Sequence, residues 1–210
     1  MNNHEGSHLL LIATNNKGKI EELQDLLKDT GIELITPAQI HLNLDVPEDG
    51  HTYAENATKK ALAFASASGL VSLADDSGLE VDALDGAPGL YSARYGSSNG
   101  RKLSDKDRRT FLIQNLQDKP HPWTARFHAT IAIAIAIPNG EMHLTDGFCE
   151  GEIIPEERGT GGFGYDPIFL LSELGKTMAE LSMDEKNRLS HRAKAVIKAK
   201  PILFQLFKPK

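Results

Sequence analysis

The chain has 210 residues, of which 40% are hydrophobic and 25% charged, close to the averages of soluble globular proteins. This composition excludes wholesale disorder and collagen-like repetition. The formal net charge is -6, with 29 acidic residues against 23 lysines and arginines. Such a balance argues against a broad nucleic-acid-binding surface, and it leaves single nucleotides as possible partners.

Cysteine usage and the apolar runs indicate the compartment. Cys149 is the only cysteine, so the chain can form no intrachain disulfide and no cysteine-rich zinc site, and we expect a cytoplasmic protein. We interpret Cys149 itself as buried and inert. The apolar stretch 9–13 is too short for the core of a signal peptide, and the longest apolar run, 129–137, is about half the length of a membrane-spanning helix. We therefore expect neither secretion nor membrane insertion.

The first part of the chain alternates strand and helix patterns. Residues 9–13 are typical of a buried strand, residues 20–31 carry apolar side chains at helical spacing, and residues 32–36 resemble a second strand. Gly31 suits the left-handed residue that ends a helix. This β-α-β start indicates an α/β fold with a mixed or parallel sheet.

A long helix is predicted over residues 53–68. Thr52 and Glu55 have the spacing of a capping box, in which Thr52 accepts a backbone hydrogen bond and Glu55 reaches back, and Gly69 follows the alanine-rich run. Residues 71–74 then form a buried strand. We expect it to end in a turn at residues 75–78, the position where α/β proteins often place their chemistry.

The second part of the chain predicts a helix over 104–117 and a long central strand over 123–137. In that strand the isoleucines share one face and the alanines the other, which indicates packing on both sides. Further elements are expected in this order: a hairpin at Pro138-Asn139-Gly140, a return strand over 141–148, a glycine-rich loop over 159–164, a strand over 167–171, and a helix capped by Ser190 that Pro201 kinks or interrupts.

The turn at residues 14–19, Thr-Asn-Asn-Lys-Gly-Lys, opens the first helix. Unpaired backbone N–H groups and the positive end of the helix dipole favour a phosphate there, and Lys19 adds charge. A plain helix cap is the alternative. The turn is not a P-loop, because Ala13 and Ile20 stand where that pattern needs glycine and Ser or Thr.

Acidic residues supply a possible metal site. Asp75 and Asp76, with Glu48 and Glu55, offer the hard oxygen ligands that Mg²⁺ prefers when it is bound partly through phosphates. The alternative for the adjacent pair is a solvated cap. Lys60 could neutralise phosphate charge, or it could be a solvated lysine on the helix surface.

The loop Gly159–Gly164 matches G-x-G-x-x-G letter by letter, but no helix pattern follows it, so we reject a dinucleotide site. Phe163 and Tyr165 beside Asp166 could instead stack on a base and hydrogen-bond its edge, or they could belong to a tight turn with core aromatics. The pair 191–192, His-Arg, could bind a carbonyl or phosphate oxygen, with surface charge as the alternative.

Six ordered segments closely resemble the inosine triphosphate pyrophosphatase family, the Ham1-like or RdgB-like non-standard purine nucleoside triphosphatases. They are residues 13–19 (ATNNKGK), 55–57 (ENA), 74–79 (ADDSGL), 86–95 (GAPGLYSARY), 161–167 (GGFGYDP) and 190–195 (SHRAKA). Together they extend over essentially the whole chain. One departure is Asn15, where many members have glycine.

The resemblance implies a single domain over 1–210 with an elongated two-lobed α/β fold, a long central mixed sheet flanked by helices, an active site in the cleft between the lobes, and usually a homodimer. It also implies the reaction. A non-standard purine nucleoside triphosphate such as ITP, dITP or XTP is hydrolysed to the monophosphate and pyrophosphate, with Mg²⁺ as cofactor and with no nucleic-acid or membrane partner.

The resemblance also assigns roles to residues. Asp76 would activate the attacking water with Asp75 and Lys60 close by, and Glu48 and Asp76 would hold Mg²⁺. Phe163 would stack on the base, and His191 and Arg192 would donate to the 6-keto oxygen. The substrate-contact positions are Thr14, Asn15, Asn16, Lys17, Gly18, Lys19, Ser77, Phe163, Gly164, Tyr165, Asp166, Lys186, His191 and Arg192.

Two other functions stay open. A pyrophosphatase of the Maf type would act on other modified or pyrimidine nucleotides. A nucleotide-binding regulatory module would bind without turnover, although a pure binder would gain from replacing the repulsive acidic pair.

Overall fold

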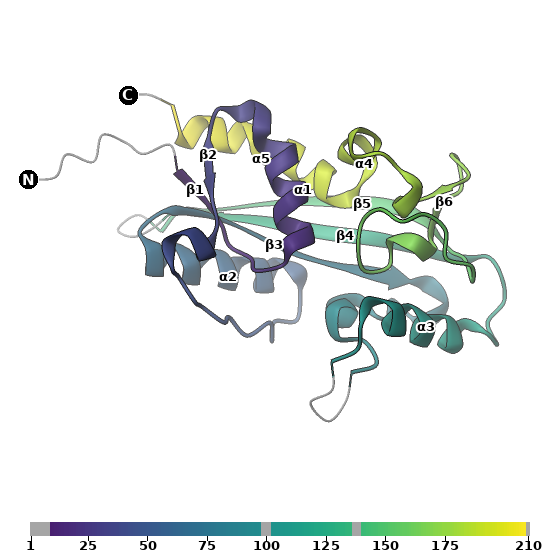
Figure 1. Ribbon diagram of the computed structural model, residues 1–210. Helices are drawn as coiled ribbons and strands as arrows, with labels where there is room; N and C mark the ends of the chain where they lie inside the picture. The colour runs from purple at the N-terminus through teal and green to yellow at the C-terminus, as the bar shows by residue number, and fades with distance from the viewer. Residues whose placement is uncertain (1–8, 98–101, 136–139, 209–210) are drawn as a thin grey trace, which may run out of the picture. The chain divides into compact units, whose positions relative to one another are not determined.

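The computed structural model describes residues 9–97, 102–135 and 140–208, and Figure 1 shows their helices and strands. The described strands form a seven-stranded sheet in the order β2-β1-β3-β4-β5-β6-β7. Strand β1 pairs in parallel with both β2 and β3, whereas β6 pairs antiparallel with β5 and β7. The sheet is therefore mixed and flanked by helices, and the predicted α/β class is confirmed.

The helices and strands occur in the predicted order. The strands are β1 (Leu9–Ile12), β2 (Glu33–Ile35), β3 (Val71–Val81), β4 (Trp123–Ala134), β5 (Met142–Ile153), β6 (Phe169–Leu171) and β7 (Lys176–Thr177). The helices are α1 (Lys17–Leu27), α2 (Tyr53–Ser68), α3 (Asp105–Leu116), α4 (Met183–Leu189) and α5 (His191–Leu206). The chain divides into two compact units, one of residues 1–76, 130–146 and 195–210, the other of residues 77–129 and 147–194.

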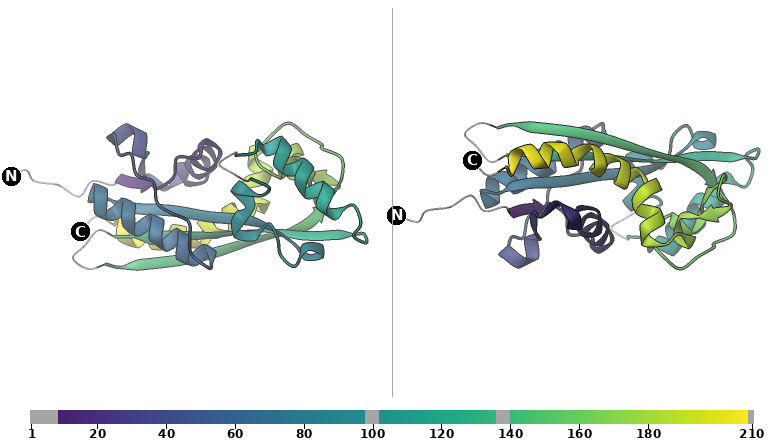
Figure 2. Two further views of the ribbon diagram at one scale, coloured as in Figure 1. Left: turned by 90° about the horizontal axis from the view of Figure 1, so that it is seen from below. Right: turned by 90° about the horizontal axis from the view of Figure 1, so that it is seen from above.

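In the first unit, α2 packs on the strands through small side chains. Its residues Ala57, Ala61, Phe64 and Ala65 form a buried cluster with alanines of β3 and β4. The isoleucines that alternate with the β4 alanines are buried as well. Helices α2 and α5 lie on opposite faces of these strands (Figure 2), so the predicted strand with alanine on one face and isoleucine on the other is packed on both sides.

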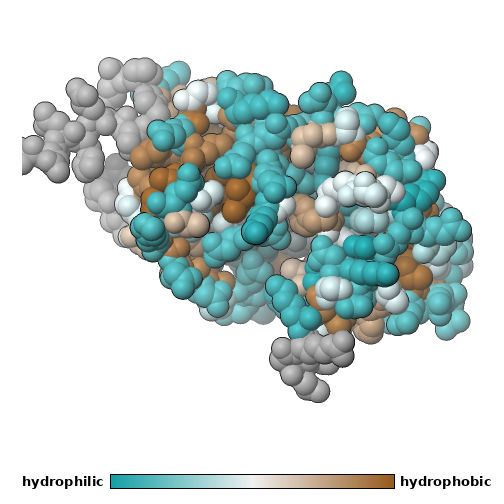
Figure 3. All heavy atoms as spheres, in the orientation of Figure 1, coloured by the Kyte–Doolittle hydropathy of each residue, from teal (hydrophilic) through white to brown (hydrophobic). Residues whose placement is uncertain are grey.

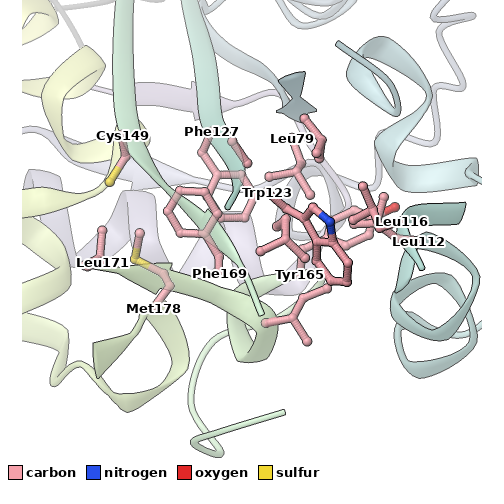
Figure 4. Packing of buried hydrophobic residues seen from close by; sticks show 14 of the residues in the cluster. Leu79, Leu112, Leu116, Trp123, Phe127, Cys149, Tyr165, Phe169, Leu171 and Met178 are labelled. Carbon is pink, nitrogen blue, oxygen red and sulfur yellow. The ribbon is translucent and has the colours of Figure 1, made fainter. Parts of the chain in front are cut away.

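The second unit has its own core. Aromatic and aliphatic side chains from β3, α3, β4, β5 and β6 gather in one cluster (Figure 4). In this cluster the ring centroids of Phe127 and Phe169 lie 4.4 Å apart. Tyr165 belongs to this cluster and is 4% exposed. This core fixes the strands that carry the polar residues described below.

Several predicted boundaries were wrong. Strand β3 continues through residues 75–81 where a turn was expected, and β5 continues to Ile153. Helix α5 runs through Pro201 to Leu206, so the proline does not interrupt it, and buried residues on both sides of the proline hold the helix in place. The predicted hairpin turn lies mostly outside the described residues, but Ile135 N donates to Glu141 O at 3.1 Å just beside it.

Hydrophilic side chains predominate on the face shown in Figure 3, with apolar side chains between them. Within the described part of the chain, none of the helices combines the length and the apolar character needed to cross a membrane.

Candidate active site

The predicted turn at 14–19 does open a helix, but α1 already begins at Lys17, inside that turn. Asn16 is the N-cap, and its side chain accepts a hydrogen bond from Lys19 N at 3.2 Å, while Asn16 N donates to Thr14 Oγ1 at 3.2 Å. Asn15, Asn16 and Lys17 are exposed. The first turn of a helix leaves N–H groups without a partner inside the helix, so this exposed turn can receive an anion.

Lys19 points from this turn to a buried carboxylate. Its Nζ lies 2.5 Å from Oδ1 of Asp75 and 3.2 Å from the carbonyl oxygen of the same residue. Asp75 is fully buried. Because an unpaired charge is costly in the interior, the Lys19 ammonium is what permits Asp75 to be ionised there.

Asp75 and Asp76 lie within strand β3, so the predicted acidic turn was wrong. Successive side chains of a strand point to opposite faces of the sheet. Asp75 accordingly reaches Lys19 of α1, whereas Asp76 lies beside Lys60 of α2. Each carboxylate therefore makes its ion pair with a different lysine.

Lys60 is the centre of the second ion-pair group. Its Nζ lies 2.9 Å from Glu48 Oε1, 2.7 Å from the carbonyl oxygen of Asp75 and 3.4 Å from Asp76 Oδ1. Both Lys60 and Asp76 are buried. The alternative of a solvated surface lysine was therefore wrong for Lys60.

The same arrangement shifts the pKa of both groups. Burial lowers the pKa of Lys60, but the carboxylates of Asp76 and Glu48 outweigh burial and raise it above its usual value. For Asp76, burial raises the pKa above the usual value, and Lys60 and Lys19 offset this only in part. A carboxyl with a raised pKa is a better proton acceptor than an ordinary aspartate.

Glu48 and Asp76 are the two carboxylates that could hold a metal ion. The described residues contain no cluster of three or more His, Cys, Asp or Glu side chains suited to a metal. Mg²⁺ in nucleotide enzymes typically takes one or two protein carboxylates, with phosphate oxygens and waters completing its shell. The donor set therefore fits Mg²⁺ bound together with a nucleotide.

Glu55 does not join this group. Its Oε2 accepts from His51 N at 2.8 Å, so the half of the capping box that would join Glu55 to Thr52 was wrong. Thr52 does accept from Glu55 N, at 3.0 Å.

Asn56 is a site residue that the sequence reasoning missed. Its Oδ1 accepts from Gly50 N at 2.8 Å, and its side chain also hydrogen-bonds the carboxylate of Asp76. Asn56 is 1% exposed. The available signal was its spacing of four residues from Lys60, which places both polar side chains on one face of an alanine-rich helix.

In the second unit, the residue that follows Asp76 begins another polar group. Arg192 Nη2 donates to Ser77 Oγ at 3.0 Å. Arg192 is 1% exposed, and His191 is buried with its ring stacked on Phe127 at 4.7 Å between centroids. The alternative of surface charge was therefore wrong for both residues.

The glycine-rich loop adds an aromatic ring to this group. Asp166 Oδ2 accepts from Phe163 N at 2.9 Å and pairs with Lys186 Nζ at 2.7 Å. The charged groups of Lys186 and Arg192 lie 5.5 and 5.7 Å from the centroid of the Phe163 ring. The half-buried ring of Phe163 thus lies in a cationic surrounding.

Tyr165 is placed apart from these side chains. Its hydroxyl donates to Ser92 O at 2.9 Å inside the core, and burial raises its pKa above the usual value. The alternative of a core aromatic therefore holds for Tyr165, and its side chain does not lie with that of Phe163.

The predicted residues thus gather in two groups. The first contains the turn at 14–19 with Glu48, Lys60, Asp75 and Asp76, and the second contains Ser77, Phe163, Asp166, Lys186, His191 and Arg192. Asp76 and Ser77 are consecutive residues of β3. The first group has an exposed helix start and paired carboxylates, which suit a polyphosphate. The second group has a cation-flanked aromatic ring, which suits a heterocycle.

Comparison with known proteins defines the class. The model of the Ham1 family matches residues 10–202, and the chain belongs to this family. A dITP/XTP pyrophosphatase of Desulforamulus reducens is 50% identical over 199 residues, which are 94% of this chain and 96% of that protein. A dITP/XTP pyrophosphatase of Bacillus subtilis is 42% identical, with 92% and 96% of the two chains covered.

Solved structures agree with this membership. The Ham1 protein of Staphylococcus aureus superposes with a TM-score of 0.80 at 38% identity, covering 94% of this chain and 99% of that one. A HAM1 protein from Coxiella burnetii gives a TM-score of 0.82 at 38% identity, covering 94% and 98%. The resemblance inferred from six short segments is therefore confirmed over the length of the fold.

Proposed function

We propose that the chain is a nucleoside triphosphate pyrophosphatase that hydrolyses dITP, XTP and ITP to the nucleoside monophosphate and pyrophosphate. Similarity to proteins named dITP/XTP pyrophosphatase supports this reaction. The observation that carries the proposal is the contact of the Lys60 ammonium with both Glu48 and Asp76, in the unit that also holds the exposed start of α1. That combination suits a polyphosphate and the general base that its hydrolysis requires.

The triphosphate binds at the turn before α1. The N–H groups of its first turn and the positive end of the helix dipole face the anion, and exposed Lys17 adds charge. Lys60, already placed among carboxylates, screens the phosphate charge from Asp76 and Glu48.

Mg²⁺ is part of the proposal, with Glu48 and Asp76 as its protein ligands. When bound, the ion neutralises phosphate charge and lowers the pKa of a water. Two carboxylates that face a single ammonium are the oxygen donors that the chain offers for this purpose.

In the hydrolysis, the anhydride bond between the α- and β-phosphates breaks and one water is consumed. Asp76 accepts the proton of the attacking water, whose oxygen becomes part of the monophosphate, and the β- and γ-phosphates leave as pyrophosphate. Burial raises the pKa of Asp76 and so its basicity, and Lys60 and Lys19 offset this rise in part. Asn56 orients this carboxylate through its hydrogen bond.

The base binds at the second group. Phe163 stacks on the purine, and Arg192 and His191 donate to the 6-keto oxygen of hypoxanthine or xanthine. Adenine presents an amino group at this position, which would leave the buried donors without acceptors. ATP is therefore a poor substrate.

The same proposal includes a homodimer, as the family resemblance implies, and a cytoplasmic location, which the single cysteine favours. Static light scattering of the full chain tests the stoichiometry, and a mass of one chain would contradict it.

The experiment for the proposed function measures pyrophosphate release from dITP, XTP, ITP, GTP, ATP and dTTP, with Mg²⁺ and with EDTA. Release confined to the non-standard purines and lost with EDTA supports the proposal. Release mainly from pyrimidine nucleotides would instead favour a Maf-type activity, and nucleotide binding without release would favour a regulatory module.

A further inference from the structure

Both backbone groups of Gly164 are held by side chains of helix α3. Asp105 Oδ2 accepts from Gly164 N at 2.8 Å, and Arg109 Nη1 donates to Gly164 O at 2.8 Å. The two side chains come from residues four apart, which share one face of the helix. A distant helix thereby fixes one peptide unit on each side of a loop glycine.

The two α3 side chains are themselves held. Asp105 pairs with Arg108, and Arg109 makes two hydrogen bonds to Glu157, at 2.9 Å from Nε and 2.8 Å from Nη2. Ser104 caps the first turn of α3 by accepting from Asp107 N at 3.2 Å. The side chains that contact Gly164 are therefore already ordered, so that they lose little conformational entropy on forming these hydrogen bonds.

Gly164 directly follows Phe163, the residue proposed to stack on the base. The N–H of Phe163 donates to Asp166 Oδ2 at 2.9 Å, and the N–H of Gly164 donates to Asp105 Oδ2. Gly164 has φ +61°, a conformation that few other residues adopt readily. The direction of the Phe163 ring therefore depends on contacts at both of its flanking peptide bonds.

We infer that Asp105 and Arg109 are positioning residues for nucleotide recognition, which hold Gly164 so that the Phe163 ring stays oriented toward the substrate base. This inference rests on the proposed function. Neither side chain touches the base, and their contribution is confined to the half of the substrate that Phe163 contacts. The phosphate end is bound by other residues and does not depend on them.

The test compares Asp105→Ala, which removes the acceptor, with Asp105→Asn, which keeps an oxygen acceptor for Gly164 N. Asp107→Ala is the control for the loss of an acidic residue from the same helical turn, because the carboxylate of Asp107 accepts from the capping Ser104 Oγ at 2.7 Å. For Asp105→Ala we expect the KM for dITP to rise about 10-fold, as for the loss of one charge-assisted hydrogen bond, with little change in kcat. Asp105→Asn restores most of this loss.

A probe without a base separates positioning from general damage. Tripolyphosphate should inhibit Asp105→Ala as well as it inhibits the wild type, because it binds only at the phosphate end. An unchanged KM for dITP in Asp105→Ala, or an equal weakening of tripolyphosphate inhibition, would overturn the inference.

A second measurement is independent of activity. Amide hydrogen exchange at Gly164, followed by NMR, should accelerate in Asp105→Ala and stay slow in Asp105→Asn and Asp107→Ala. If Asp105→Ala does not fold, Arg109→Met removes the carbonyl contact and answers the same question through KM. If Gly164 exchange accelerates in Asp105→Ala as expected but the wild type hydrolyses no nucleotide, the proposed function is rejected and the backbone contact stands. If the wild type is active but Gly164 exchange is unchanged in Asp105→Ala, the inferred contact is rejected and the proposed function stands.

Discussion

Gly162 lies so close to Asp166 that a β-carbon at Gly162 would overlap with Oδ2 of that carboxylate. The same oxygen accepts from Phe163 N and pairs with Lys186. The absence of a side chain at Gly162 is thus a condition for the ion pair and for the loop conformation together.

Gly162→Ala should therefore raise the KM for dITP by more than the strain of a positive φ alone would, because the new methyl group displaces the Asp166 carboxylate. Gly175→Ala is the matched control, since Gly175 also has positive φ but has open space around it. We expect Gly175→Ala to cost about 1 kcal/mol of stability and to leave KM unchanged. Gly162→Ala should destabilise by more and raise the KM for dITP, measured by thermal unfolding and pyrophosphate release. Equal effects of the two variants would contradict the Asp166 argument.

Asp76→Asn should lower kcat by roughly 10²- to 10⁴-fold, because it removes the proposed proton acceptor. The fold should persist, since an amide keeps most of the volume and can still accept hydrogen bonds. Asp49→Asn, at an exposed acid that pairs with Lys59, should behave like the wild type. Circular dichroism checks the fold, and wild-type turnover by Asp76→Asn would exclude the water-activating role.

Lys60→Met should leave Glu48 and Asp76 without their shared counter-charge, at a cost of about 3 kcal/mol near neutral pH. Burial already raises the pKa of Asp76 in the folded state, and loss of the Lys60 ammonium raises it further, so the folded state keeps this proton to higher pH than the unfolded chain does. The variant therefore loses stability as pH rises from about 4 to 7, and its deficit relative to the wild type widens over that interval. Urea unfolding at several pH values measures this. Lys59→Met, an exposed neighbour on the same helix, should show no such widening.

Arg192→Ala should narrow the preference for dITP over ATP by about 10- to 100-fold, because a buried donor for the 6-keto oxygen is lost. The measurement is the ratio of kcat/KM for the two nucleotides. Arg188→Ala, at an exposed arginine of α4, controls for loss of positive charge. An unchanged ratio in a folded Arg192→Ala protein would show that base selection depends on other residues.

Cys149 gives a pH dependence at the alkaline end. Burial raises the pKa of its thiol from 9.0 to about 11. Because the unfolded chain ionises first, stability is intact below pH 9 and falls as pH rises toward 11, by up to about 2 kcal/mol. The difference in unfolding free energy between the wild type and Cys149→Ala should shrink by this amount over the interval. A difference independent of pH would contradict the buried neutral thiol.

Local patterns predicted the elements well. The capping residue, the alanine-rich run and the final glycine defined α2 at residues 53–68, as observed. Strand β3 was predicted too short because charged residues ended the apolar run at Ala74. Nothing local reveals that each acid meets a lysine from another element, 56 residues away for Asp75 and 16 for Asp76. Long-range pairing of this kind is what permits charge inside a strand.

The candidate site was predicted in part for the same reason. The helix start at 14–19 and the residues of the second group follow from short motifs, whereas the orientation of a side chain within a motif does not. Tyr165 belongs to the loop motif yet points into the core, and Asn56 has an inconspicuous sequence context yet contacts Asp76. Asp105 and Gly164, which are hydrogen-bonded, are 59 residues apart in the chain, so that no short motif reveals their contact.

The placement of Asp75 and Asp76 on opposite faces of β3 has a consequence for how the chain can vary. Inserting or deleting one residue in β3 ahead of Asp75 would reverse the face of every side chain beyond that point. Asp76 would then turn away from Lys60, and Asp75 away from Lys19, so that two buried charges would lose their partners in a single step. Length variation should therefore be absent from this strand and concentrated in the connections, where no alternation has to be kept.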